Sequence, residues 1–331
     1  ADTTVFHLPA WHAVIAATYG HRCDYWLARR GDAIAGVFPV TTMRLPGPAA
    51  RLRPPKLLAM PYQLYSGLPV AADEAVQTAL VRHALVAAKQ QRASYLEIRH
   101  HAPAPFLEAL GFVPVESGLV TTAVPLPNIS LKSIRRNHRR NIKKSQDAGL
   151  TVTQGETLAD LRLFRRLYQL ESRALGAPQA GWRFYQALHD LARDHYRLFL
   201  AWQDGRCIAG MLTLDDGRTR FARLAAYSSP EAQALNASHA LYWAAIADGA
   251  ARGCTAYNCG ISWVGDEGLI HWKEGWNGRS HPVHLYVYPL RGQPPAPGGY
   301  FEGFQLAKAV WRRLPLPLAD WLGQQVTTWV G

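Results

Sequence analysis

Residues 131–149 read LKSIRRNHRRNIKKSQDAG, a stretch that holds seven Lys and Arg residues and no acidic residue before Asp147. On a helix that turns ~100° per residue, the seven cations fall within roughly one half of the cylinder, opposite the apolar and small side chains. The cationic set is Lys132, Arg135, Arg136, Arg139, Arg140, Lys143 and Lys144, and the opposite set is Leu131, Ile134, His138, Ile142 and Ser145. We therefore expect an amphipathic helix over residues 131–148, capped by Ser130 and ended by Gly149.

The single sign of this face indicates a binding function. Solvated helix faces usually mix charges, because like charges four residues apart repel by about 0.2–0.5 kcal/mol. The plain alternative is a solvated charge run. A face without acidic residues favours binding of a polyanion or a phosphorylated ligand.

Composition places the chain among globular proteins with room for two domains. It has 331 residues, 48% hydrophobic and 18% charged, and a net charge of +12, of which the basic stretch supplies seven. The four cysteines show no CxxC spacing and the histidines no HExxH pattern, so we expect reduced thiols and no metal site. Residues 1–12 lack the pattern of a signal peptide, and no uncharged apolar run reaches the ~18 residues of a membrane span. The expected location is therefore the cytoplasm.

Hydrophobic periodicity predicts alternating strands and helices in both halves. In the first half we expect strands at 5–8, 25–30, 34–43, 56–60 and 95–99, helices at 9–19, 73–90 and 105–110, and two further strands after Phe112. In the second half we expect strands at 150–153, 196–202, 207–214, 219–227, 255–259 and 282–288, and helices at 158–174, 182–192, 237–251 and 269–274.

The two halves also share short sequences at equivalent places. Ile34-Ala35-Gly36-Val37 and Ile208-Ala209-Gly210-Met211 each follow a hairpin turn. Gly111-Phe112 corresponds in the same way to Gly275-Trp276. We interpret the chain as two copies of a β-α-α-β-β-β-α-β-α-β unit joined by the basic helix.

The end of the chain leaves two interpretations open. A Pro/Gly-rich linker at 291–299 leads to a segment with Trp311, Trp321 and Trp329 beside Arg312 and Arg313. This tail either packs across the second domain or makes an interfacial membrane contact.

The element order resembles the acetyltransferase (GNAT) fold, an α/β fold with a mixed sheet. Two such units joined by a basic helix resemble the Fem family of peptidyltransferases, in particular its branch associated with exopolysaccharide and PEP-CTERM gene clusters. The residues that carry the resemblance are 134–144 (IRRNHRRNIKK), Asn258-Cys259-Gly260, 271–278 (HWKEGWNG) and 310–317 (VWRRLPLP). The implied division is a first GNAT-like domain at 1–128, the basic linking helix at 129–149, a second GNAT-like domain at 150–290, and a linker and tail at 291–331.

The resemblance implies an acyltransferase that forms an amide bond. The best-known members move an amino acid from aminoacyl-tRNA to an amine of a cell-wall precursor, and a cationic face suits the phosphates of tRNA. This chain lacks the long heptad arm of some members. It also has Asn258 where many relatives carry an acidic residue, which argues against a carboxylate role there.

Lys273 is the expected catalytic residue, since the family's matching lysine neutralises charge at the reacting ester or the tRNA end. The plain alternative is a surface lysine on a short helix, and we expect an exposed position for its side chain. Acyl transfer from an ester needs a neutral amine and a group that holds the oxyanion, and no nucleophile motif such as GxSxG is present, so we expect direct attack by the acceptor. Candidates to accept the proton are Asp266, Glu267, His271 and Glu274, and candidates for acceptor binding are Tyr62, Gln63, Tyr65, Glu97, Arg99, Asn258, Trp272 and Trp276. Glu97 and Arg99 share one face of a strand, so they alternatively pair with each other.

No cofactor is expected. Acetyltransferases that use coenzyme A hold its pyrophosphate on a glycine-containing loop before the central helix, but here that loop, 228–236 (SSPEAQALN), has no glycine. The main alternative is nevertheless an N-acyltransferase that uses acyl-coenzyme A or an acyl carrier protein on an amino sugar or lipid-linked glycan. A nucleic-acid-binding protein without catalysis is disfavoured, because the cations are confined to one helix.

Overall fold

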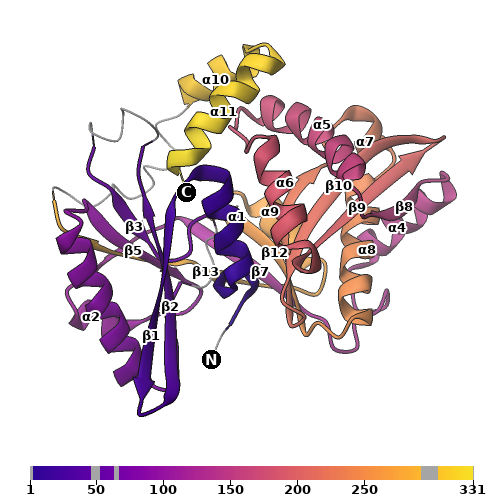
Figure 1. The fold of residues 1–331 in the computed structure, drawn as a ribbon. Coiled ribbons are helices and arrows are strands. Elements are labelled where there is room, and N and C mark those ends of the chain that lie inside the picture. Colours follow the sequence, from indigo (N-terminus) through magenta and orange to yellow (C-terminus); the bar gives the residue numbers. More distant parts are fainter. Residues whose placement is uncertain (1–2, 46–52, 63–66, 292–304, 331) are drawn as a thin grey trace. The chain divides into compact units, whose positions relative to one another are not determined.

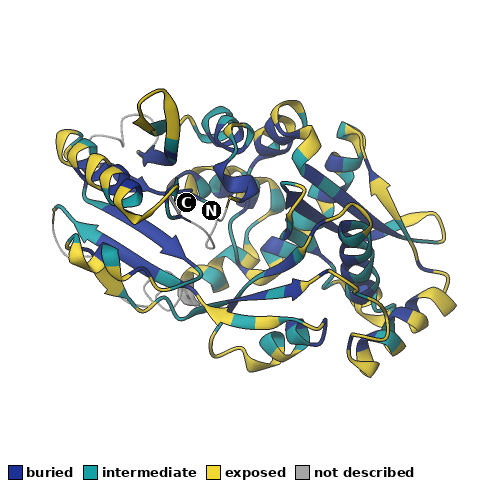
Figure 2. Cartoon of the chain, turned by 90° about the horizontal axis from the view of Figure 1, so that it is seen from below, coloured by how far each residue is buried: buried dark blue, intermediate teal, exposed yellow. Residues whose placement is uncertain are grey.

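A computed structural model describes residues 3–45, 53–62, 67–291 and 305–330. The chain forms two compact units. The first comprises Ala1–Leu119, Pro282–Gln305 and Gln324–Gly331, and the second comprises Val120–His281 and Leu306–Gly323. In each unit many of the strand residues are buried, and the helices have exposed residues on one side (Figure 2).

The first unit is built on a seven-stranded mixed sheet with the order β1-β2-β3-β5-β14-β6, in which β4 also pairs with β2. Its strands are β1 (Arg22–Arg30), β2 (Ala33–Met43), β3 (Lys56–Leu58), β4 (Val70–Ala71), β5 (Tyr95–His100), β6 (Val113–Val115) and β14 (His284–Pro289). Its helices are η1 (Val5–His7), α1 (Pro9–Tyr19), α2 (Glu74–Gln90) and α3 (Pro105–Ala109) (Figure 1).

Helix α2 shows how local sequence positions these elements. The Asp73 carboxylate accepts a hydrogen bond from the Val76 backbone N–H at 3.0 Å and so caps the start of the helix. Gly36 in β2 lets the helix approach, because a Cβ there would lie 2.7 Å from Val76 Cγ1. The apolar face of α2 then joins Phe38, Leu96 and their neighbours in the core of the first unit.

The second unit contains another seven-stranded sheet, with the order β13-β7-β12-β11-β10-β9-β8. Its strands are β7 (Leu119–Pro125), β8 (Thr151–Gly155), β9 (Tyr196–Gln203), β10 (Arg206–Asp215), β11 (Thr219–Ala226), β12 (Ala256–Trp263) and β13 (Arg279–Pro282). Its helices are α4 (Arg136–Asp147), α5 (Leu158–Leu175), α6 (Trp182–Leu191), η3 (Arg193–His195), α7 (Pro230–Ala234), α8 (Ala237–Ala251) and α9 (Glu267–Glu274).

The repeated glycine has a comparable effect in this unit. A Cβ at Gly210 in β10 would lie 2.7 Å from Phe164 Cδ2 of α5. Gly36 and Gly210, predicted to be equivalent, therefore each admit a helix side chain against the second strand of a hairpin, although the helices differ. The predicted α/β fold with two mixed sheets is confirmed.

The two units exchange strands. β14 comes from the end of the chain but pairs antiparallel with both β5 and β6 in the first sheet. β7 follows β6 directly in sequence but lies between β13 and β12 in the second sheet. The units therefore do not follow the contiguous ranges 1–128 and 150–290, because each sheet takes a strand from the other half of the chain.

One further expectation needs correction. Residues 5–8 do not form a strand but the 3-10 turn η1, in which the Thr4 N–H donates to His7 Nδ1 at 3.0 Å.

The tail forms two helices, α10 (Gln305–Arg313) and α11 (Leu316–Val330). Up to Gly323 this tail belongs to the second unit: Arg165 binds Asp320, and Gly176 lies against Lys308. Packing across the second domain is thus observed. No helix in the described part of the chain is long and apolar enough to span a membrane.

Candidate active site on the basic helix and Lys273

Helix α4 carries the cationic face, but it begins at Arg136 rather than Leu131. The Arg135 N–H donates to the Gly275 carbonyl at 2.9 Å, and residues 131–134 form turns in which Ser133 Oγ donates to the Ser130 carbonyl at 2.8 Å. Ser130 therefore does not cap the helix. Ile134, His138, Ile142 and Ser145 are buried as predicted, whereas Leu131 is exposed.

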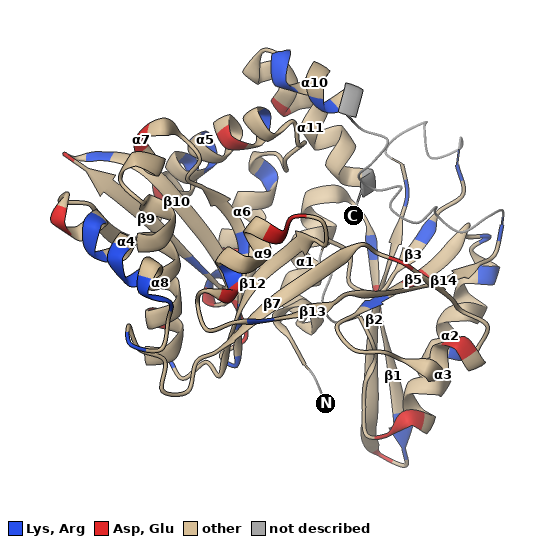
Figure 3. Cartoon of the chain, turned by 180° about the vertical axis from the view of Figure 1, so that it is seen from behind, with Lys and Arg blue, Asp and Glu red and all other residues tan. Residues whose placement is uncertain are grey.

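The cations of this face lie at the surface (Figure 3). Lys132, Arg135, Arg136, Arg140, Lys143 and Lys144 are exposed and Arg139 is half-buried. None of the seven forms an ion pair with a carboxylate of the described residues. Arg139 holds the preceding turn by donating to the carbonyls of Leu131 and Lys132. Arg135 donates to the His271 carbonyl of α9. The remaining cations of this set leave a positive surface able to meet phosphates.

The buried side of α4 packs against α8 and α9 through an aromatic cluster. His138 Nε2 donates to the Trp272 carbonyl at 2.8 Å, and Trp272 Nε1 donates to His239 Nε2 at 3.2 Å. Burial lowers the pKa of His138, and it lowers the pKa of His239 to about 4. Both imidazoles are therefore neutral at neutral pH. Trp276 is fully buried beside them.

Gly275 is the position that admits His138. A Cβ at Gly275 would lie 2.4 Å from His138 Nε2, which is too close for any larger residue without movement. The HWKEGWNG segment thus fits α4 through a specific contact. The sequence did not reveal this role of Gly275.

Lys273 lies on α9 and is buried, with 4% exposure, contrary to the expectation of an exposed position. Its Nζ donates to the Ile261 carbonyl at 2.6 Å and to the Gly260 carbonyl at 3.3 Å, and no described carboxylate forms an ion pair with it. Burial lowers its pKa to about 8. An ammonium with three N–H groups that uses two on the backbone has one left for an oxygen of a ligand.

The carbonyls that Lys273 binds lie just beyond the point where β12 stops pairing with β11. β11 and β12 pair in parallel only over Thr219–Phe221 and Ala256–Asn258. Beyond this point Gly260 adopts a φ of +74°, which glycine tolerates without strain. The backbone groups of β12 that β11 no longer pairs are thus available to side chains, and Lys273 takes two of them.

Asn258 stabilises the same irregular stretch of β12. It is buried, its Oδ1 accepts from the Gly260 N–H at 2.8 Å, and its Nδ2 donates to Thr121 Oγ1 of β7 at 2.9 Å. Its polar atoms are therefore directed at the protein. Trp276 is likewise enclosed, so of the three acceptor candidates in this unit only Trp272 is partly exposed.

The other acceptor candidates belong to the first unit. Glu97 and Arg99 form the buried ion pair that the sequence allowed as an alternative. Lys56 is buried near them, and burial lowers its pKa to about 8. Tyr62 stacks on Tyr19 with 4.4 Å between ring centroids, and its hydroxyl donates to the Thr328 carbonyl at 3.2 Å. Gln63 and Tyr65 lie outside the described residues.

A carboxylate that the sequence did not single out occupies the end of β11. Glu171 Oε2 of α5 accepts from the backbone N–H groups of Ser228 at 2.9 Å and Tyr227 at 3.2 Å. No sequence motif marks Glu171, because the contact depends on how α5 packs. Among the described residues no cluster of His, Cys, Asp and Glu is arranged to hold a metal ion.

Comparisons with known proteins agree with this architecture. The sequence model of the acetyltransferase (GNAT) domain family matches residues 132–274, so the matched region includes the basic helix and ends just after Lys273. Residues 132–274 are therefore similar to an acetyltransferase (GNAT) domain. Comparison with curated protein sequences finds no match.

Solved structures superpose on this fold over most of the chain, as three examples show. FemX is 16% identical and superposes with a TM-score of 0.70 over 86% of this chain and 92% of that chain. L-PGS from Bacillus licheniformis is 14% identical, with a TM-score of 0.57 over 93% and 97% of the two chains. A tandem GNAT protein from the clavulanic acid biosynthesis pathway is 13% identical, with a TM-score of 0.51 over 83% and 85%. The expected resemblance to the Fem family is confirmed at the level of the fold.

Proposed function

We propose that this protein transfers an amino acid from aminoacyl-tRNA to an amine of a cell-envelope or exopolysaccharide precursor, as the resemblance to Fem peptidyltransferases implies. The cationic face of α4 carries the proposal. Its exposed lysines and arginines have no carboxylate partners among the described residues, so they are available to the phosphates of a tRNA acceptor arm. Such a donor would place the protein in the cytoplasm.

The segment that leads into α8 supports a donor other than coenzyme A. Pyrophosphate binding at a helix start needs free backbone N–H groups. Here the N–H groups of Ala232, Gln233, Leu235 and Asn236 bond within the short helix α7 and its caps. The Glu171 carboxylate accepts hydrogen bonds from the N–H groups of Tyr227 and Ser228, which precede α7, and its negative charge would repel a phosphate.

The alternative donor is an acyl-coenzyme A or an acyl carrier protein, with an amino sugar or lipid-linked glycan as acceptor. The match to an acetyltransferase (GNAT) domain family and the similarity to a tandem GNAT protein favour it. The experiment below separates the two donors.

In the proposed reaction the acceptor amine attacks the ester carbonyl directly. The new C–N bond forms as the ester C–O bond breaks, the amine loses a proton, and the tRNA hydroxyl leaves with a proton. We assign to Lys273 the stabilisation of the oxyanion through its remaining N–H. Asp266 already caps α9 by accepting from the Leu269 N–H, so Glu267, His271 and Glu274 are the freer candidates for the proton acceptor.

We also propose a peripheral membrane contact through the tail. Val310 of α10 and Leu318 and Trp321 of α11 are 54%, 43% and 59% exposed, next to the exposed cations Arg312 and Arg313. Apolar and cationic side chains together suit the surface of an anionic bilayer. An acceptor bound to the cell envelope would then be within reach.

The donor is tested by incubating the protein with labelled aminoacyl-tRNA or labelled acetyl-coenzyme A and an envelope-derived pool of amine acceptors, with and without ribonuclease. We expect transfer from aminoacyl-tRNA only, abolished by ribonuclease and weakened steeply by salt. Transfer that survives ribonuclease and depends on the thioester would establish the alternative.

A further inference from the structure

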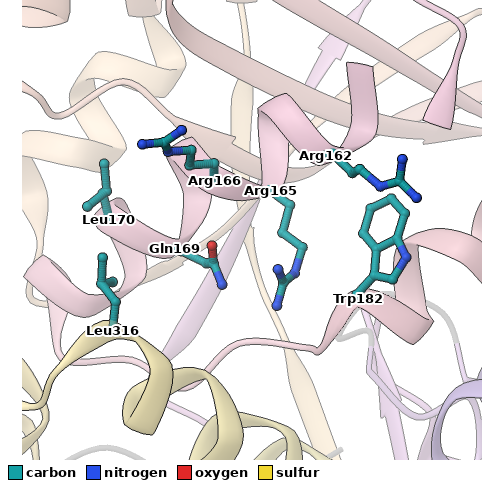
Figure 4. A pocket seen from close by; sticks show the side chains of 7 residues that line it. All are labelled: Arg162, Arg165, Arg166, Gln169, Leu170, Trp182 and Leu316. Carbon is teal, nitrogen blue, oxygen red and sulfur yellow. The ribbon is translucent and has the colours of Figure 1, made fainter. Parts of the chain in front are cut away.

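A cavity of about 540 Å³ in the second unit lies apart from the groups assigned above. It is lined by Arg162, Arg165, Arg166, Gln169 and Leu170 of α5, Trp182 of α6 and Leu316 of α11 (Figure 4). The five α5 residues follow the spacing i, i+3, i+4, i+7, i+8, so they form one face of this helix. In Figure 4 the side chains of Arg165, Arg166 and Gln169 lie at the middle of the view, Arg162 and Trp182 at one end, and the two leucines at the other.

The charge of this cavity is only partly compensated. Arg165 binds both carboxylate oxygens of Asp320 at 2.6 Å, but its Nε is buried without a partner among the described residues. Arg162 lies over the ring of Trp182, with 5.1 Å from its guanidinium carbon to the ring centroid, and has no ion pair with a described carboxylate. Arg166 is exposed and likewise has none. Three guanidinium groups around one carboxylate favour an anionic ligand, and a phosphate matches their geometry.

The surroundings indicate that the ligand also has an apolar part. Leu170 lines the cavity and is 45% exposed. Leu316 and Asp320 form the side of α11 that faces the cavity and Arg165, whereas Leu318 and Trp321 lie roughly 140–200° around the helix from Leu316. The tail thus packs on the second unit through one side and exposes apolar side chains on the other. This arrangement is typical of a surface that meets a membrane.

We propose that the cavity is a binding site for the phosphate of an anionic phospholipid. The phosphate binds Arg162 and Arg166, and the adjoining glycerol and acyl carbons contact Leu170 and Leu316. The site would hold a lipid at the membrane surface without changing it covalently. This proposal rests on the proposed membrane contact of the tail and is independent of the proposed acyl transfer.

The test uses the full chain and water-soluble dihexanoyl phosphatidate, with inorganic phosphate as the probe without an apolar part, both titrated calorimetrically. We expect the lipid to bind about tenfold or more tightly than phosphate, and the variant Arg162→Ala/Arg166→Ala to weaken lipid binding about tenfold or more. The matched control, Arg218→Ala/Arg279→Ala, removes two exposed charges from the same unit outside the cavity and should bind lipid as the wild type does.

Unchanged lipid binding in the cavity variant, or an equal loss in the control, would overturn the site. Equal affinities for phosphate and for the lipid would assign the cavity to a soluble phosphate compound and overturn the lipid assignment. Flotation with phosphatidylcholine vesicles, with and without phosphatidate, tests the membrane contact separately. Trp321→Ala should reduce flotation while soluble lipid binding persists, and full flotation of this variant would refute the tail contact alone.

Discussion

Lys273 has a structural function in the fold in addition to the catalytic function that we propose for it. Its Nζ satisfies the carbonyls of Gly260 and Ile261, where β12 no longer pairs with β11. A buried ammonium without an ion-pair partner is costly, and this cost is what lowers its pKa to about 8. Proteins keep such groups mostly at functional sites.

Substitution Lys273→Ala should lower turnover about 100-fold or more, because one oxyanion donor contributes ~2.7–4 kcal/mol to the transition state. Since the side chain is buried, the variant should also lose about 1–3 kcal/mol of stability through two unpaired carbonyls. Turnover is measured at saturating substrate below the melting temperature of the variant. A normal rate would limit Lys273 to a structural function.

The lowered pKa of Lys273 predicts a pH dependence with a definite sign. Turnover should fall as the pH rises through about 8, because the ammonium that holds the oxyanion is lost. Stability should change in the opposite direction: between about 8 and 10.5 the unfolded chain binds more protons at this residue, so its contribution to the unfolding free energy rises with pH. Denaturation of wild type and Lys273→Met across this range measures the difference. A difference that is flat or falls with pH would contradict the assignment.

Gly275→Ala should destabilise the second unit by about 1–3 kcal/mol, because its Cβ would lie 2.4 Å from His138 Nε2. Gly268→Ala in α9, the helix that ends just before Gly275, is the matched control, since a Cβ there would lie 4.0 Å from its nearest neighbour, Asp266 Oδ1. That control should gain about 0.5–1 kcal/mol from helix propensity. Urea unfolding of both variants tests the contrast, and equal stabilities would refute the packing argument.

At the scale of elements, the cations of α4 fall into two groups. Some bond to other parts of the protein, and others form no bond to any residue that the structure describes. Arg139 supports the turn before the helix and Arg135 binds α9, so reversing these charges would disturb folding. Arg136, Lys143 and Lys144 are exposed, and their side chains form no hydrogen bond or ion pair with a described residue. They are the better probes of ligand binding.

The triple reversal Arg136→Glu, Lys143→Glu and Lys144→Glu should abolish tRNA binding and leave the melting temperature nearly unchanged. The control reverses Arg183, Arg218 and Arg279, which are exposed on the same unit away from α4. Binding is measured across salt concentrations, where the wild-type slope should be roughly −0.7 to −0.9 per phosphate contacted. Binding of undiminished strength and slope in the α4 variant would remove this helix from the site.

The sequence predicted the elements better than their ends and contacts. Periodicity identified α1, α2, α5 and the buried side of α4, because amphipathic patterns are local. It misplaced the start of α4, because the Arg135 N–H just before the helix bonds to the carbonyl of Gly275, which is 140 residues away in the chain. The burial of Lys273 and the contact of Glu171 with β11 depend on packing in the same way, and no spacing of residues signals them.

At the scale of the whole molecule, the strand exchange was the feature least accessible from sequence. A repeat of similar units predicts contiguous domains, and β7 and β14 read as ordinary last strands of their own halves. Their partners, β12 and β5, are selected by long-range pairing that no local pattern encodes. The consequence is that the first unit needs residues near the end of the chain.

This dependence gives a test by truncation. A chain of residues 1–281 lacks β14, which contributes the buried Leu285, Tyr286 and Val287 and pairs with both β5 and β6. We expect the first unit to lose cooperative folding, because β5 would expose an unpaired edge and the Ala104 N–H would lose its 2.8 Å bond to the Tyr286 hydroxyl.

Amide hydrogen exchange resolves the outcome by strand. In residues 1–281 the amides of β5 should lose protection, while those of β10, whose partners β9 and β11 are retained, should keep it. A chain of residues 1–304, which keeps β14 and lacks only α10 and α11, is the control and should protect β5. Protected β5 amides in the shorter chain would mean that the first half folds as a contiguous domain, and the exchanged strand would then be dispensable.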